Sequence, residues 1–260
     1  MADWEIDGPR TIQFDETPEV LRVALVAGDV EVTAAEGPAI LMVKEVVGRP
    51  LEVSLSGGRL EVIHERRSWP SSERISASIV LNVPAECRVQ LEAVSASVLA
   101  AGLAADARIE TVSGELTLES MGGPVRAITV SGDLASRGQA GQLRGETVSG
   151  DVTLDAYSAT SVKVHSVSGE VVADLQQAGS DASAEVATVS GNVYLRLAED
   201  PTQEVRLESV SGRLSSAFPG LQSKKSPGSR SLKGSLGVGQ GRLKVTTVSG
   251  AVALLGEADA

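Results

Sequence analysis

The triplet Val-Ser-Gly recurs seven times in this chain, at nearly constant intervals. The triplets begin at Val112, Val130, Val148, Val167, Val189, Val210 and Val248. Successive intervals are 18, 18, 19, 22, 21 and 38 residues, and the last equals two intervals of about 19. Self-similarity at such a period is typical of a solenoid, in which each turn of chain stacks on the previous one. The repeat therefore predicts an all-β fold, a single-stranded parallel β-solenoid.

Apolar residues follow each triplet with the period of a β-strand. The residue four positions after the triplet valine is always Leu or Val, and the residue six positions after it is apolar or small. Both positions share the parity of the valine, so in one strand all three side chains face the same side. Polar residues alternate with them, as in a half-buried strand. We therefore expect the triplet valine to lie on the buried side.

The apolar pattern changes parity before each triplet. Upstream, the apolar or small positions lie five and three residues before the valine, for example Ala107 and Ile109 before Val112. One straight strand cannot bury both sets on one side, so a bend or bulge is expected at the segment Thr/Ser-Val-Ser-Gly. If repeats stack in register, the hydroxyls of this segment form two ladders that satisfy polar groups at a crowded corner. Seven equivalent serines in a chain with two histidines are not expected to be nucleophiles.

The repeat also predicts how the chain is organised. Residues 1–84 lack the triplet, alternate as strands and are expected to form an N-terminal cap. Residues 85–256 are expected to form roughly nine solenoid rungs, with a mobile Ser/Gly/Pro-rich insertion near residues 218–234 and a short tail at residues 257–260. We lean to a right-handed solenoid because parallel crossovers generally are right-handed.

Composition narrows the classes of function. The net charge is −11, which disfavours binding to nucleic acid through general electrostatics. The single cysteine, Cys87, cannot form an internal disulfide and is expected to be a small core or surface residue rather than a reactive thiol. The chain has no signal-like N-terminus and no apolar run long enough to cross a membrane, so we expect a cytoplasmic protein that does not insert into membranes. No cofactor is expected, because no phosphate loop or metal-spaced Cys/His set is present.

The tandem copies resemble a known bacterial family. The segments Thr-Val-Ser-Gly-Glu-Leu at 111–116, Thr-Val-Ser-Gly-Asp-Leu at 129–134 and Thr-Val-Ser-Gly-Asp-Val at 147–152 are similar to the repeats of an adhesin-like β-strand domain of unknown function. The segment 236–250 is similar to the closing region of that family, and Gly28 to Val30 fits its early Gly-Asp-Val phrase. The resemblance implies a β-solenoid and no catalytic residue.

Two charged sets are candidate sites. The first is an acidic ladder, which occupies the position after the glycine on four consecutive repeats: Glu115, Asp133, Asp151 and Glu170. Stacked carboxylates offer oxygens to a hard cation such as calcium, although a solvated face is the simpler interpretation. The second is a basic run without acids, with Lys224, Lys225, Arg230 and Lys233 as interaction candidates and Arg242 and Lys244 just beyond them. It is interpreted as a site for an anionic partner or as a solvated loop.

These observations favour a non-catalytic scaffold or interaction protein. The alternative is a protein that binds or cleaves an acidic polysaccharide, although the scarcity of aromatic residues gives such a groove few stacking platforms. Partners are expected to be a protein or a second copy, joined through solenoid ends whose strands lack a neighbour. The weaker end is expected at the C-terminal strand, residues 251–255, which only a short tail follows.

Overall fold

The computed structural model is an all-β protein. It describes residues 2–64, 74–155, 159–175, 182–198, 200–238 and 240–256, and within these ranges every regular element is a strand. Over the same ranges, no helix is long and apolar enough to span a membrane. The all-β prediction is confirmed, whereas the expected tail at 257–260 lies outside the described residues. Two compact units make up the chain, Met1–Gly132 and Asp133–Ala260.

The first unit combines an antiparallel part with the first parallel rungs. Its strands are β1 (Ala2–Ile6), β2 (Arg10–Gln13), β3 (Val20–Ala34), β4 (Ile40–Val47), β5 (Leu51–Ser56), β6 (Arg59–His64), β7 (Ser76–Val83), β8 (Arg88–Ala101), β9 (Ala107–Thr111), β10 (Leu116–Glu119) and β11 (Val125–Thr129). The pairs β1–β5, β2–β4, β4–β7 and β5–β6 are antiparallel. The long strand β3 pairs in parallel with β6, β7 and β8. Strand β3 thus joins the predicted cap to the repeats; the boundary at residue 84 stays a prediction.

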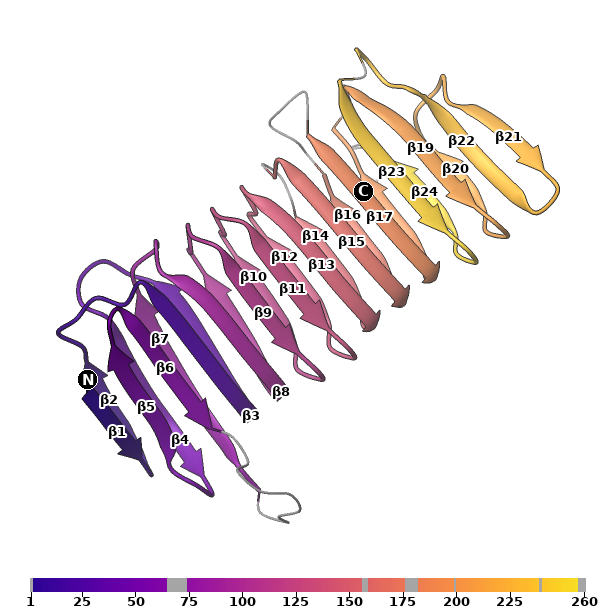
Figure 1. The fold of residues 1–260 in the computed structure, drawn as a ribbon. Helices are drawn as coiled ribbons and strands as arrows, with labels where there is room; N and C mark the ends of the chain where they lie inside the picture. Colours follow the sequence, from indigo (N-terminus) through magenta and orange to yellow (C-terminus); the bar gives the residue numbers. More distant parts are fainter. Residues whose placement is uncertain are drawn as a thin grey trace. The chain divides into compact units, whose positions relative to one another are not determined.

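The second unit stacks its strands in two parallel series (Figure 1). Its strands are β12 (Leu134–Arg137), β13 (Gln142–Ser149), β14 (Val152–Asp155), β15 (Ser161–Ser168), β16 (Val171–Asp174), β17 (Ser183–Ser190), β18 (Val193–Arg196), β19 (Gln203–Ser209), β20 (Leu214–Ser216), β21 (Gln222–Ser226), β22 (Ser229–Ser235), β23 (Gly241–Thr247) and β24 (Val252–Leu255). The upstream series runs β13–β15–β17–β23–β19. The downstream series runs β12–β14–β16–β18–β24–β20.

The last rung of the second unit lies inside the stack (Figure 1). Strand β23 pairs with β17 on one edge and β19 on the other, and β24 pairs with β18 and β20. The expectation that residues 251–255 form a weakly capped end is therefore wrong, because that strand has a partner along both edges. Strands β19 and β20, which flank the triplet at Val210, come earlier in the sequence than β23 and β24. In the stack, however, they lie one place further out.

A hairpin occupies the segment expected as a mobile insertion. Strands β21 and β22 pair antiparallel with each other, and β22 pairs antiparallel with β19. The segment therefore has regular secondary structure and extends the upstream series, so this unit is mixed rather than purely parallel. The mobility of the segment stays a prediction.

The chain bends at each triplet, as the change of parity predicts, but the valine does not face the core. In the first repeat, Ala107, Ile109, Leu116 and Leu118 are all fully buried. The triplet valines, in contrast, are 43 to 50% exposed. The residue before each valine is the buried one, so the parity changes after it and the valine points outward. The predicted inward valine is therefore wrong, while the core positions on both sides of the bend are confirmed.

Close backbone stacking explains the glycine of the triplet. A Cβ placed on Gly250 would lie 1.9 Å from the carbonyl oxygen of Gly191, the equivalent residue of the neighbouring rung. Gly132 stands in the same relation to Gly114 in the first unit, also at 1.9 Å. A Cβ at such a distance would overlap the carbonyl oxygen, so only glycine, which has no Cβ, can occupy this position.

Candidate functional site

The repeated hydroxyl groups serve the bend itself. The side chain of Thr111 accepts a hydrogen bond of 3.1 Å from the backbone N–H of Gly114, and Thr129 and Ser209 do the same for Gly132 and Gly212. The triplet serines donate to the carbonyl oxygen of the valine one rung away, as Ser211 does to Val248 at 3.2 Å. These groups satisfy polar atoms at a crowded corner, as predicted.

Carboxylates of the acidic ladder form hydrogen bonds between neighbouring rungs. Its members Asp133, Asp151 and Glu170 are exposed in the second unit, and Glu115 is exposed in the first. The carboxylate of Asp133 accepts a hydrogen bond of 2.9 Å from the backbone N–H of Asp151. The carboxylate of Asp151 in turn accepts one of 2.7 Å from Glu170. A short acid at this position therefore caps an N–H of the next rung.

Asn192, a neutral residue at the same position of its repeat, makes the same kind of hydrogen bond. The amide oxygen of Asn192 accepts a hydrogen bond of 3.1 Å from the backbone N–H of Ala251. A negative charge is thus not required for the contact. Among the described residues, no group of three His, Cys, Asp or Glu side chains is placed to hold a metal ion. The calcium hypothesis stays a prediction.

The four basic candidates are divided between the two faces of the hairpin. Lys224 lies opposite Ser231, and Lys233 lies opposite Arg206, so both point outward from the sheet. Arg230 lies opposite the buried Ser209 and donates a hydrogen bond of 3.0 Å to the carbonyl oxygen of Gly212. Lys225 pairs with Arg230 and shares its side. The sequence-local cluster is therefore not one surface patch.

Stacking builds a different basic surface, which we call the basic face. It is the outward side of β13, β15, β17, β23, β19, β22 and β21 in the second unit. Its cations come from seven positions spread over 100 residues of sequence. They are Arg144, Lys163, Arg206, Lys224, Lys233, Arg242 and Lys244. Four carboxylates lie among them: Glu146, Glu185, Glu204 and Glu208. Cations outnumber carboxylates here, although the whole chain has a net charge of −11.

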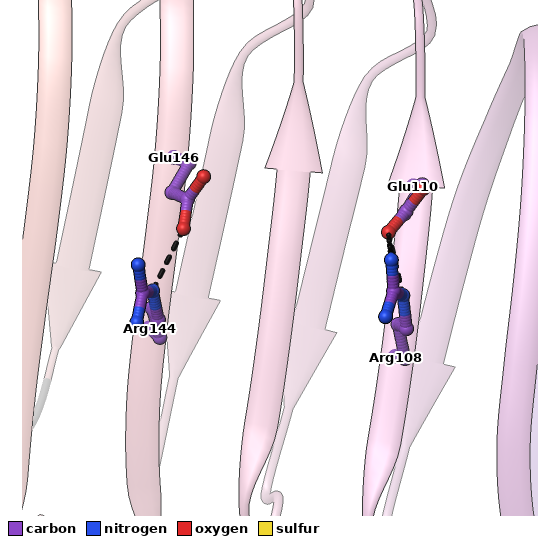
Figure 2. Close-up of polar contacts among 4 residues, drawn as sticks. All are labelled: Arg108, Glu110, Arg144 and Glu146. Carbon is purple, nitrogen blue, oxygen red and sulfur yellow. Dashed lines mark hydrogen bonds and ion pairs between the residues drawn. The ribbon is translucent and has the colours of Figure 1, made fainter.

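Ion pairs hold part of this surface in place. Arg144 contacts Glu146, two residues along β13, at 2.7 Å, and Figure 2 shows this pair together with its equivalent on β9, Arg108 and Glu110. Glu208 binds Arg206 and Lys233, each at 2.9 Å. These contacts orient the side chains but add little stability, because exposed pairs are screened by water.

Hydrogen bonds to lysine lower the pKa of two of the carboxyls. The ammonium of Lys244 lies 2.6 Å from Glu185 and holds the pKa of that carboxyl below its usual value. Lys233 does the same to the pKa of Glu208, with help from Arg206. Both carboxylates therefore stay ionised at neutral pH and neutralise part of the basic face.

Three cations of the basic face make no ion pair within the described part of the chain: Lys163, Arg242 and Lys224, all of them exposed. Lys163 is in register with Glu185 and helps to lower the pKa of that carboxyl, and Arg242 is in register with Glu204. Arg242 borders an open depression of about 350 Å³ that Glu204, Arg206 and Lys244 also line. Chemically, the surface offers exposed ammonium and guanidinium donors to an anion.

Sequence reasoning found one part of the basic face and missed another. Arg242, Lys244 and the hairpin lysines were visible as a local run, whereas Arg144, Lys163 and Arg206 were not considered. The available signal was the position four residues before the triplet valine, which is Arg or Lys in six of the seven repeats. The exception is Glu185.

Two other polar residues have simple environments. His165 is exposed on the outer side of β15. Cys87 is buried, and burial raises the pKa of its thiol to about 11, because the thiolate would be desolvated. Cys87 is therefore a packed core residue and a poor nucleophile, which confirms the prediction.

Comparison with known families is decisive for the fold. The model of the family described as Toastrack DUF4097 matches residues 21–255, nearly the whole chain. The chain belongs to the Toastrack DUF4097 family. This Toastrack membership confirms the adhesin-like resemblance at the level of a family without an established function, and it indicates no catalytic activity. No match was found among curated proteins.

Several solved structures are similar to this chain at low sequence identity. A provisionally named lipid-binding protein from Parabacteroides distasonis has a TM-score of 0.51 and 14% identity, over 96% of this chain and 99% of that one. A provisionally named adhesin from Bacteroides fragilis has a TM-score of 0.42 and 12% identity, covering 95% and 97%. A provisionally named cell adhesion protein from Clostridium sporogenes has a TM-score of 0.28 and 10% identity, covering 96% and 100%. At these identities the likeness concerns the fold alone.

Proposed function

We propose that this toastrack protein is a non-catalytic binding or scaffold module that acts through the outer faces of its sheets. One observation carries the proposal. Repeated polar groups at the bend make hydrogen bonds inside the fold: Thr129 accepts one from Gly132 within its own rung, whereas Ser131 and Asp151 bond to a neighbouring rung. What remains available for recognition is the set of outward side chains along the strands.

The names of similar proteins agree with a binding role. The three names describe an adhesin, a cell adhesion protein and a lipid-binding protein. The proposal takes from them only the general idea of a binding surface. It further includes a right-handed sense for the parallel rungs, which rests on the crossover rule.

A turnover assay tests the non-catalytic part. The full chain would be incubated with polyuronates, neutral glycans, esters and phosphodiesters, and new reducing ends, unsaturated products or released acids would be measured. We expect no product above a blank purified in parallel. Turnover that survives repurification and is lost in Arg206→Gln or Arg242→Gln would overturn the proposal. It would favour an enzyme acting on acidic polysaccharide in the depression beside Arg242.

A further inference from the structure

We infer that the basic face of the second unit binds a linear acidic polysaccharide that lies across the strands. This inference rests on the proposed binding function and specifies its ligand class and surface. It is carried by the register of the cations, by the exposed cations that make no ion pair and by the hydroxyl groups beside them.

The cations form a row perpendicular to the strands. Arg144 is paired in register with Lys163, and Lys163 with Glu185. The row continues from Glu185 to Lys244 and Arg206, and ends at Lys233. Neighbouring strands are separated by about 4.8 Å, which is comparable to the length of one sugar ring in an extended chain. A polymer with one carboxylate per sugar can therefore stay in step with this row.

Ion pairs within the protein use some cations of the row and leave others available to a ligand. Glu185 is held by Lys244 at 2.6 Å, and Glu208 by Lys233 and Arg206 at 2.9 Å each. Lys163 and Arg242 lie beside these pairs and make no ion pair in the described ranges, although each is in register with a carboxylate, Glu185 and Glu204. Because both cations are exposed, a ligand carboxylate can reach them without breaking an existing ion pair.

Hydroxyl groups accompany the cations. Ser161 and Ser183 are paired in register, and the hydroxyl of Ser183 donates to that of Ser161 at 3.2 Å. Ser183 is itself in register with Arg242. Thr246 and Ser231 point outward from β23 and β22. A sugar chain has hydroxyls that can pair with these groups, whereas a bare phosphate polymer has none.

The composition of the face separates this ligand from nucleic acids. None of its seven strands contains Phe, Tyr or Trp. Single-stranded nucleic acids are usually held by stacking of bases on aromatic rings, in addition to backbone charge. Duplexes and anionic membranes present dense charge over an area larger than this surface.

The opposite outer face of the same unit provides a control surface. Its downstream strands present Asp155, Asp174 and the ladder acids Asp151 and Glu170 outward. Arg137 is exposed there on β12, and Lys225 lies on the inner side of the hairpin, away from the basic face. Replacement of Arg137 and Lys225 removes one arginine and one lysine, the same change as replacement of Arg242 and Lys163.

Affinity electrophoresis of the full chain in gels that contain polygalacturonate, with dextran as the neutral reference, tests the inference. We expect retardation by polygalacturonate that weakens with added salt. Lys163→Gln with Arg242→Gln should reduce the affinity about tenfold, whereas Arg137→Gln with Lys225→Gln should change it by less than about twofold. All four residues are exposed, and melting curves of both variants would verify that they are folded. Lys163→Arg with Arg242→Lys should restore retardation.

Each other result would overturn the inference. If polygalacturonate does not retard the protein, the proposed ligand is wrong. If both double variants lose the same affinity, the proposed site is wrong. Stronger binding to oligo-deoxythymidine, to inorganic polyphosphate or to anionic vesicles than to polygalacturonate would assign the face to that polyanion instead. None of these outcomes requires turnover, so the inference can fail while the non-catalytic function stands. Cleavage of polygalacturonate with binding retained would overturn the non-catalytic function alone.

Discussion

The carboxylate of Asp151 accepts a hydrogen bond of 2.7 Å from the backbone N–H of Glu170, one rung further along the stack. The contact joins two rungs that are 19 residues apart in sequence. It gives the acid at this repeated position a role in folding that needs neither a metal nor a ligand. The same geometry recurs between Asn192 and Ala251 at 3.1 Å, with an amide in place of the acid.

Removal of this acceptor should destabilise the second unit. Asp151→Ala leaves the N–H of Glu170 to water, and we expect a loss of about 1–2 kcal/mol in the free energy of unfolding. Asp151→Asn should retain most of the stability, because Asn192 shows that an amide oxygen suffices. Urea titration followed by circular dichroism measures both. Glu170→Ala is the control and should cost less than about 0.5 kcal/mol. Equal losses in Asp151→Ala and Glu170→Ala would contradict the capping role.

Calcium should have little effect on stability. Asp133 and Asp151 each use one carboxylate oxygen for a backbone N–H, so fewer oxygens remain for a cation that needs six to eight ligands. We expect the melting temperature to be unchanged in millimolar calcium. A rise in melting temperature that disappears in the variant Asp133→Asn with Asp151→Asn would instead establish the acidic ladder as a calcium site.

The core of each rung could be predicted from the sequence because it depends on local alternation. Leu116 and Leu118 are buried where the period of two places them. The outward position of Val112 could not be predicted from parity, since it depends on where within the bend the chain changes side. The bend is fixed by stacking of backbone on backbone, which no single repeat reveals.

Neither the order of the rungs nor the basic face could be predicted from the sequence. Every rung presents the same kind of strand edge, so the repeat does not specify that β23 lies between β17 and β19. The row from Arg144 to Lys233 exists only once that order is known. Hydroxyl ladders, in contrast, follow directly from in-register stacking, and their prediction was confirmed at Thr111 and Ser113.

Glycine at the bend should be intolerant of even a methyl group. In Gly250→Ala the new Cβ would lie 1.9 Å from the carbonyl oxygen of Gly191, so the two rungs must separate. We expect a loss of about 3 kcal/mol or more in the free energy of unfolding. Gly8→Ala is the matched control, because no atom lies within 4 Å of its Cβ position, and it should cost less than about 0.5 kcal/mol. Similar unfolding midpoints for the two variants would rule out this account of the triplet glycine.

The ion pairs of the basic face should be visible in acid titration. Lys244 lowers the pKa of Glu185 from its usual 4.5. A lowered pKa in the folded state means that the pair contributes stability above the unfolded pKa, and that this stability is lost as the pH falls through the folded pKa. Carbon-detected NMR titration should therefore place Glu185 below 4.5, and Lys244→Met should raise its pKa. An unchanged titration in Lys244→Met would show that the contact is not made in solution.

The lysines of the outer hairpin strand should prevent self-association. Strand β21 pairs only with β22 among the described strands, so its other edge has unpaired N–H and C=O groups. Lys224 and Lys225 point to opposite faces of that edge, and each would meet a like charge if a second copy paired with it. Lys224→Val with Lys225→Val removes this repulsion and increases β-propensity, so sedimentation should show concentration-dependent dimers and larger species. Lys163→Val is the control, because β15 has partners along both edges, and it should sediment as the parent does.

If the double variant sediments like the parent across the concentration range, the lysines do not protect this edge. Association through sheet ends must then be sought at β1 or β2 of the first unit, for which the described strands provide one partner each.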